Sequence, residues 1–272
     1  MVPDIATFID LKRYPLKSMD TAGGKANIHH YNANLEAEGV CVLPGFLKTS
    51  TISTMLNEVA PLLPNAIPRD VGRPIYGWMD NTGFPPSHPR GMVFSHKNSA
   101  VTLDKFGKSS SIRRLYFWEY LTEFVRRCLG YDSLYCMGCP HLSLELKVMH
   151  PGDTLPWHFD TNDGVVSLLL QKPDEGGEFE YAPYVRSEDD ENYPEIVRVV
   201  DERSTKVRSV ETGPGSLILF KGRRCIHRVT PIGDSTKPRL ILLLSYDRTP
   251  DMRFPEQTVQ AVINSTAQLN AG

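Results

Sequence analysis

Residues 142–149 read Leu142-Ser143-Leu144-Glu145-Leu146-Lys147-Val148-Met149. Apolar and polar side chains alternate there with a period of two, which predicts a half-buried β-strand. Six more strands are predicted after it, separated by turn signals such as Gly176-Gly177: residues 165–171, 178–181, 206–211, 216–220, 224–230 and 239–246. Short strands at this spacing indicate an antiparallel sandwich or barrel, with its core over about residues 140–250.

The preceding segment, residues 1–139, is expected to flank this barrel with helices and a lid. A short strand is predicted at Val40-Cys41-Val42-Leu43, and a helix that begins at Thr49 or Ser50 is predicted after it. A second helix is predicted over residues 109–129, ending at Gly130. Residues 1–34 show little pattern.

Two segments are expected to be irregular. Residues 64–108 hold many prolines and glycines and show little periodicity, so they are expected to form either a lid over a substrate or a surface loop, with His88 and His96 flanking a proline-rich part of it. The acidic stretch of residues 187–195 is interpreted as a solvated excursion from the barrel.

The composition excludes several classes of protein. The chain has 272 residues, a formal net charge of −2 and 40% hydrophobic residues, as in a folded protein without the basic field that attracts nucleic acid. No apolar run approaches the roughly 20 residues of a membrane span, and the N-terminus does not resemble a secretory signal. Five cysteines, an odd number, indicate reduced thiols in the cytoplasm. A single domain over residues 1–272 is predicted, and a homodimer is left open.

His158, Asp160 and His227 are the candidate metal ligands. His158 and Asp160 are two residues apart, so on a strand both side chains point to one side, and His227 lies in a later predicted strand. Two histidines and one carboxylate on one face of an ion are the ligands of non-haem Fe(II) oxygenases. Arg239, at the start of an apolar strand, needs an anionic partner inside a barrel. The distal carboxylate of 2-oxoglutarate suits its guanidinium, although an ion pair with Asp247 or Asp234 is the structural alternative.

The order of these motifs resembles that of the Fe(II)/2-oxoglutarate-dependent dioxygenases. The resemblance implies a mainly β fold, the double-stranded β-helix (a jelly-roll or cupin-like barrel), with N-terminal helices on its outside. It also implies that His158, Asp160 and His227 bind the iron and that Arg239 binds 2-oxoglutarate. A finer resemblance, over roughly residues 110–250, is to bacterial enzymes that hydroxylate or halogenate free amino acids; it is carried by Trp157-His158-Phe159-Asp160, Gly176-Gly177-Glu178-Phe179-Glu180-Tyr181, Asp190-Glu191-Asn192-Tyr193, Leu219-Phe220-Lys221-Gly222-Arg223 and His227-Arg228-Val229-Thr230-Pro231.

Within that group the residue at position 160 separates two outcomes. Halogenases carry a small Gly or Ala there, which leaves a coordination position for halide, whereas Asp160 fills the position and adds a negative charge. The resemblance therefore implies hydroxylation of an unactivated C–H bond with Fe(II), 2-oxoglutarate and O2, releasing succinate and CO2. Desaturation and cyclisation stay open, and the expected substrate is a free amino acid or a similar small polar metabolite.

The remaining site residues are weaker candidates. Trp157, Asp163 and Glu145 lie near the metal ligands in the sequence. Asp163 or Glu145 would hold the ammonium of an amino acid, and Arg186 would hold its carboxylate, with solvated charges as the alternative.

Two alternative interpretations use other features of the sequence. Cys136, Cys139 and His141 form a fragment of a zinc site that no second motif completes, so buried thiols are favoured over zinc. For the whole protein, the alternative function is a non-oxidative cupin-like isomerase, lyase or sensor, which needs the metal ligands but no anchor for 2-oxoglutarate.

Overall fold

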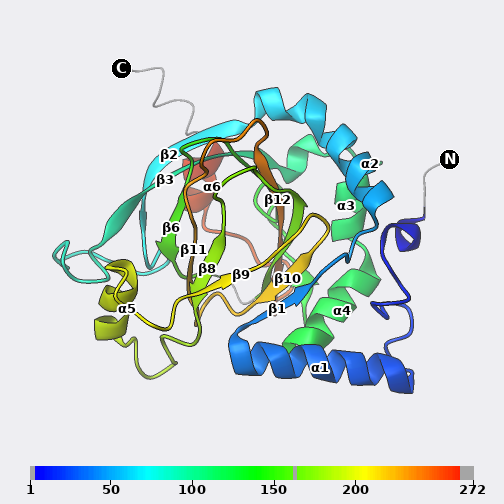
Figure 1. Ribbon diagram of the computed structural model, residues 1–272, viewed down its shortest axis with the longest axis horizontal. Coiled ribbons are helices and arrows are strands. Elements are labelled where there is room, and N and C mark those ends of the chain that lie inside the picture. Colours follow the sequence, from blue (N-terminus) through cyan, green and yellow to red (C-terminus); the bar gives the residue numbers. More distant parts are fainter. Residues whose placement is uncertain (1–3, 162–163, 264–272) are drawn as a thin grey trace.

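The computed structural model describes residues 4–161 and 164–263. Two antiparallel sheets form a jelly roll, with helices packed on the outside of the larger one (Figure 1). The larger sheet has the order β1-β10-β7-β12-β5-β3-β2, with β4 paired to β12. Its strands are β1 (Val40–Leu43), β2 (Ile67–Pro74), β3 (Val93–Thr102), β4 (Tyr135–Cys136), β5 (Leu144–Met149), β7 (Gly164–Gln171), β10 (Leu217–Phe220) and β12 (Arg239–Asp247). The smaller sheet, β6-β11-β8-β9, contains β6 (Leu155–His158), β8 (Phe179–Ala182), β9 (Arg208–Val210) and β11 (Ile226–Val229). The predicted double-stranded β-helix with flanking helices is confirmed.

Strand β12 shows how the sheet separates a core from a cavity. Leu240, Leu242 and Leu244 belong to the main hydrophobic core, beside the helices. Arg239 and Leu243, on the other face of the strand, line cavities inside the barrel. Burial of each leucine contributes roughly 1.5–3 kcal/mol, so this alternation holds the helices to the sheet.

The prediction that residues 142–149 form a half-buried strand was wrong about the burial of its polar face. All six residues of β5 are buried. Leu144, Leu146 and Val148 face the main core, while Glu145 and Lys147 face a cavity rather than solvent. An alternating pattern cannot distinguish solvent from a polar cavity, because both accept charged side chains.

The helices differ from the prediction at two places. Residues 1–34 were expected to be weakly patterned, yet α1 (Ala22–Glu38) begins there, capped by the Thr21 hydroxyl, which accepts a hydrogen bond from the Gly24 amide. The single helix predicted over residues 109–129 is instead α3 (Ser111–Tyr116) and α4 (Glu119–Leu129), separated where Trp118 takes an extended backbone. The predicted helix after Lys48 is confirmed as α2 (Thr49–Val59).

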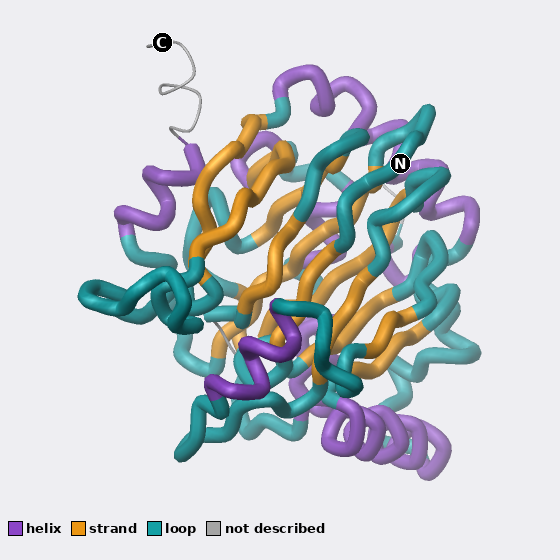
Figure 2. The backbone as a smooth tube through the Cα atoms, turned by 60° about the vertical axis from the view of Figure 1, so that its left-hand side comes forward, coloured by secondary structure: helices purple, strands orange, loops and turns teal. Residues whose placement is uncertain are grey.

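The two segments expected to be irregular contain regular structure. Residues 67–74 and 93–102 form a hairpin of β2 and β3, paired from Ile67 with Ala100 to Pro74 with Val93. Its strand pattern is hidden in the sequence because one face carries cavity-lining residues such as Arg69 and His96. The acidic stretch leads into α5 (Tyr193–Val200), which was not predicted. In Figure 2 the loop that joins β2 to β3 extends away from the barrel.

Shorter elements complete the chain. Turns of 3-10 helix lie at Ile5–Phe8 (η1), Ala60–Asn65 (η2) and Leu103–Lys105 (η3), and α6 (Glu256–Ile263) follows the last strand. No helix in the described ranges is both long enough and apolar enough to cross a membrane. The cytoplasmic location, the homodimer and the single domain stay predictions.

Candidate metal centre

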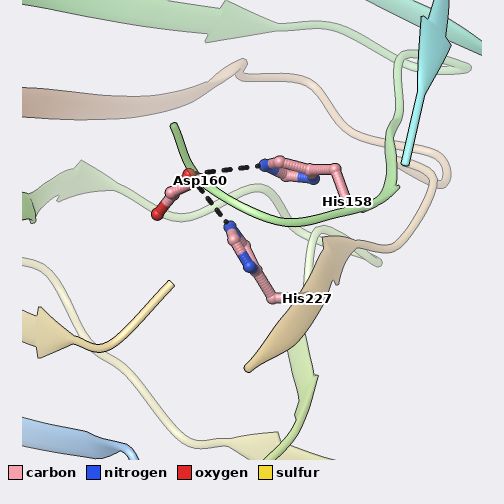
Figure 3. A group of neighbouring side chains, drawn as sticks. All are labelled: His158, Asp160 and His227. Carbon is pink, nitrogen blue, oxygen red and sulfur yellow. Dashed lines mark ion pairs between the residues drawn. The ribbon is translucent and has the colours of Figure 1, made fainter. Parts of the chain in front are cut away.

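The smaller sheet brings the three candidate metal ligands together. His158 ends β6 and His227 lies on β11, where the two residues are direct partners in the antiparallel register. Asp160 follows β6 by two residues, and one of its oxygens, Oδ1, lies 3.7 Å from Nε2 of His158 and 3.5 Å from Nε2 of His227 (Figure 3). The three ligand atoms lie within 4.8 Å of one another, and no other such group occurs among the residues that the structure describes.

Both imidazoles are prepared to bind a metal through Nε2. Nδ1 of His158 lies 2.8 Å from the Pro156 carbonyl, and Nδ1 of His227 lies 3.1 Å from the Cys225 carbonyl. A carbonyl accepts a hydrogen bond from a protonated Nδ1, which leaves the lone pair on Nε2, the usual arrangement of a metal-bound histidine. Burial, followed by the nearby Arg73 and His227, holds the pKa of His158 well below its usual value, so this ring stays neutral. The donor set therefore fits a divalent cation such as Fe(II).

Gly222 creates the space in which the Asp160 carboxylate lies. A Cβ added at Gly222 would lie 1.9 Å from Oδ2 of Asp160, and the Gly222 carbonyl accepts a hydrogen bond of 3.0 Å from the Asp160 amide. The sequence shows this glycine only as part of a motif, so its role was not predicted.

Arg239 lies in the same inner compartment as the metal ligands. This compartment is bounded by the two sheets, and it is lined by residues that include His158, Asp160, His227, Asn98, Ser167, Phe179 and Arg239. The Arg239 guanidinium is buried, and its Nε donates a 3.1 Å hydrogen bond to the Gly177 carbonyl. Burial lowers the pKa of Arg239 to about 10, which leaves the group charged at neutral pH. Over the described ranges Arg239 forms no ion pair with Asp247, Asp234 or any other residue, so its charge is available to an anion.

An outer compartment of about 460 Å³ continues from the metal ligands towards solvent. His158 and Asp160 line both compartments. The hairpin of β2 and β3 supplies Arg69, Arg73 and His96, and its connecting loop supplies Trp78 and Asp80. Sequence reasoning missed the two arginines, because nothing in an irregular-looking segment marks an arginine as cavity-lining.

The four predicted substrate contacts have different surroundings. Glu145 lines the outer compartment, where it pairs with Arg69 and, at 3.2 Å, with Lys147. Arg186 does not line either compartment, since its guanidinium forms two 2.7 Å hydrogen bonds with Glu191. Trp157 is buried on the other face of β6, beneath the guanidinium of Arg228. Asp163 lies outside the described residues.

Most of the other residues that the sequence singled out form contacts within the protein, away from the candidate metal ligands. Arg228, the residue after His227 on β11, pairs with Glu180 and Glu202. Cys136 and Cys139 are free thiols, and Nδ1 of His141 lies 3.0 Å from Asp104, so these residues do not form a zinc site. His88 packs between Phe84 and Tyr193 in the hairpin loop, whereas His96 lines the outer compartment.

The fold is that of the Fe(II)/2-oxoglutarate oxygenases. The chain resembles a 2OG-Fe(II) oxygenase family protein from Burkholderia pseudomallei (16% identity, 82% of this chain and 91% of that one, TM-score 0.53). It also resembles the alpha-ketoglutarate-dependent epimerase SnoN from nogalamycin biosynthesis (15% identity, 82% of this chain and 84% of that one, TM-score 0.57). A third similar structure is a prolyl hydroxylase from Trichoplax adhaerens (16% identity, 84% of this chain and 93% of that one, TM-score 0.53). SnoN has been solved with Fe3+ and alpha-ketoglutarate, so the predicted cofactors are those of a protein with this fold.

The sequence itself identifies the family. Residues 24–264 match the model of the Halogenase D family, and the chain belongs to that family. The predicted superfamily is thereby confirmed. No curated protein matches the chain.

Proposed function

We propose that the protein is an Fe(II)- and 2-oxoglutarate-dependent oxygenase that hydroxylates an unactivated C–H bond of a free amino acid or a similar small metabolite. The observation that carries this proposal is the convergence of His158, Asp160 and His227 in one compartment with the buried, unpaired Arg239. Bound iron, with 2-oxoglutarate and O2, would supply the oxidation, with release of succinate and CO2. The protein's own part is to hold these groups and to position the substrate.

Arg239 supports 2-oxoglutarate as the co-substrate. A buried guanidinium without an ionic partner is costly, and a carboxylate in the inner compartment removes that cost through charge-assisted hydrogen bonds. Asn98 supports the same assignment, because its buried Oδ1 has no hydrogen-bond partner and it lines the inner compartment.

Asp160 supports hydroxylation rather than halogenation, although the family is named after a halogenase. A carboxylate at this position occupies the place that a halide needs, and its charge disfavours chloride. Gly222 leaves the room that the carboxylate requires. The chain thus keeps three protein ligands for the metal.

The outer compartment supports a substrate with a carboxylate and an ammonium group. Arg73 forms no ion pair within the described ranges, and its Nε is buried without a hydrogen-bond partner. We assign to Arg73 the carboxylate-binding role that the sequence suggested for Arg186. Asp80, exposed at the mouth, and Glu145, deeper inside, are the candidates for the ammonium.

Substrate-stimulated turnover tests the proposal. Purified protein with Fe(II), 2-oxoglutarate and O2 should form succinate when a suitable amino acid is added, and the product should gain one oxygen atom by mass spectrometry. An Asp160→Ala variant should lose this activity. A chlorinated product in the presence of chloride would contradict hydroxylation.

The Arg239→Ala variant separates the oxygenase from a non-oxidative metal protein. It should retain iron and lose 2-oxoglutarate binding, as measured by calorimetry. Unchanged binding of 2-oxoglutarate, or the absence of succinate with every candidate substrate, would favour an isomerase, lyase or sensor instead.

A further inference from the structure

The inner face of the larger sheet changes from uncharged to charged across the outer compartment. The sheet order β7-β12-β5-β3-β2 places the residues that line this compartment side by side. On β7 and β12 they are uncharged: Val165, Leu243 and Ser245. On β5 and β2 they are charged: Glu145, Lys147, Arg69 and Arg73. Leu243 and Glu145 are direct partners in the register, so the two kinds of wall meet between β12 and β5.

The C-terminal segment extends the uncharged side. Phe254 and Pro255, just before α6, line the outer compartment, as does Leu142, just before β5. Phe254 and Leu142 pack in a small apolar cluster that is separate from the main core and also contains Cys139, Val259 and Ile263. We call the lining residues of this side the uncharged wall: Leu142, Val165, Leu243, Ser245, Phe254 and Pro255. Such a wall stabilises a hydrocarbon group by removing it from water.

The carboxylates of the outer compartment provide for one ammonium group and not for two. Three described residues with carboxylates line it. Asp160 is a candidate metal ligand, and Glu145 is already in contact with Arg69 and Lys147. Asp80, exposed at the mouth, is therefore the better candidate for the α-ammonium group. A second ammonium, on a basic side chain, would find no further carboxylate among the described lining residues.

The cations are used in the same way. Arg69 and Lys147 are both in contact with Glu145, and Arg73 is the residue to which the proposed function gives the α-carboxylate. An acidic side chain would have to take Arg69 or Lys147 from Glu145. This exchange would leave the buried Glu145 carboxylate with fewer counter-charges, which is costly. A second anionic group on the substrate is therefore disfavoured as well.

We infer that the substrate is an amino acid with an uncharged, aliphatic side chain, and that Phe254 contacts this side chain. This inference rests on the proposed function and names its substrate class. The α-carboxylate would pair with Arg73 and the α-ammonium with Asp80, while the side chain would lie along the uncharged wall. A charged side chain there would lose its hydration without gaining a counter-charge.

Anaerobic calorimetry on the complex with Fe(II) and 2-oxoglutarate measures this preference without turnover. The probes are pairs of amino acids that match in size and shape and differ in polarity. L-Norleucine is paired with L-ornithine, and L-leucine is paired with L-asparagine and L-aspartate. At least one aliphatic probe should bind about tenfold or more tightly than its polar counterparts.

The Phe254→Ala variant tests the uncharged wall. It should weaken binding of the preferred aliphatic probe by about tenfold, as when an aromatic contact is truncated. It should leave the weaker binding of L-alanine nearly unchanged, because L-alanine has the same α-groups and only a methyl side chain. Val259→Ala is the matched control, since Val259 packs in the same apolar cluster but lines neither compartment. The control should change neither affinity.

Three results would overturn the inference while the proposed function stands. The first is tighter binding of L-ornithine, L-asparagine or L-aspartate than of the aliphatic partner. The second is an equal loss of aliphatic binding in Phe254→Ala and Val259→Ala. The third is failure of both aliphatic probes to bind at millimolar concentration to protein that converts 2-oxoglutarate to succinate with another substrate. Failure of the proposed function itself would be seen separately, as an absence of 2-oxoglutarate binding and of any succinate.

Discussion

Gly222 and Asp160 are in such close approach that a single methyl group on Gly222 would lie 1.9 Å from the Asp160 carboxylate oxygen. The position of the carboxylate, and hence the geometry of the three metal ligands, depends on the absence of a side chain at residue 222. The loop between β10 and β11 is therefore part of the candidate metal centre, although it contributes none of the three candidate ligands.

The Gly222→Ala variant should lose metal affinity. Because the added methyl group must displace Asp160 from His158 and His227, we expect affinity for Fe(II) to fall by roughly 10- to 100-fold, as when an outer-shell partner of a metal ligand is lost. Anaerobic titration with Fe(II) measures the change. Gly213→Ala is the control, because nothing lies within 4 Å of a Cβ at that residue. Equal affinities of the two variants would contradict the role of Gly222.

Gly177 should influence 2-oxoglutarate in a similar way. This residue has a φ of +68°, and a Cβ there would lie 3.0 Å from Cδ of Arg239 and 2.8 Å from Cδ1 of Ile232. Gly177→Ala should displace the guanidinium and raise the dissociation constant of 2-oxoglutarate about tenfold. Arg239→Ala, which removes a charge-assisted contact of roughly 1.5–3 kcal/mol, should raise it by about 10- to 100-fold.

The control for Gly177 is Gly152→Ala. Gly152 has a φ of +84° with nothing within 4 Å of a Cβ, so it has comparable backbone strain without the contact. If Gly152→Ala weakened 2-oxoglutarate binding as much as Gly177→Ala, backbone strain rather than the position of Arg239 would be the cause.

The convergence of the candidate metal ligands could be predicted from the sequence because their positions follow from strand geometry. His158 and Asp160 are two residues apart at the end of a strand, and His227 lies on a strand that the alternation of apolar residues identifies. Arg239 could be recognised because an arginine is conspicuous at the start of the strand Leu240-Ile241-Leu242-Leu243-Leu244.

The lining of the outer compartment could not be predicted in the same way. Arg69 and Arg73 lie on a hairpin whose charged inner face breaks the pattern that reveals a strand. Arg186 was chosen for its place near the motifs, yet its charge is neutralised by Glu191, five residues away. Which cation keeps a partner and which does not depends on tertiary contacts, and a single sequence carries no record of them.

The stability of the metal-free protein should decrease below about pH 6.5. Burial, Arg73 and neighbouring cations lower the pKa of His96 to about 2, whereas an unfolded histidine has a pKa near 6.5. Between these values the unfolded chain binds more protons than the folded one, so the free energy of unfolding falls as the pH falls. From pH 7.5 to 5.5 this one residue should account for about 1.4 kcal/mol.

Urea unfolding at the two pH values, with a chelator present, measures the effect. The His96→Gln variant should lose less stability between them than the wild-type protein. His29→Gln, a change at an exposed position of α1, should leave the pH dependence as in the wild type. An unchanged pH dependence in His96→Gln would show that this ring is not held neutral.

We expect Glu145 to be required for the stability of the fold. Its carboxylate pairs with Arg69 and Lys147 in a buried cluster, where both cations and Glu145 itself are no more than 9% exposed. Glu145→Gln leaves two buried cations without their anion, so we expect a loss of about 3–5 kcal/mol in the free energy of unfolding. The paired change Arg69→Met with Glu145→Met should cost less than Glu145→Gln alone, because it removes both charges together. Chemical denaturation of the three proteins measures this order. If Glu145→Gln instead kept its stability and raised only the KM of the amino acid, the carboxylate would be free to bind the substrate ammonium.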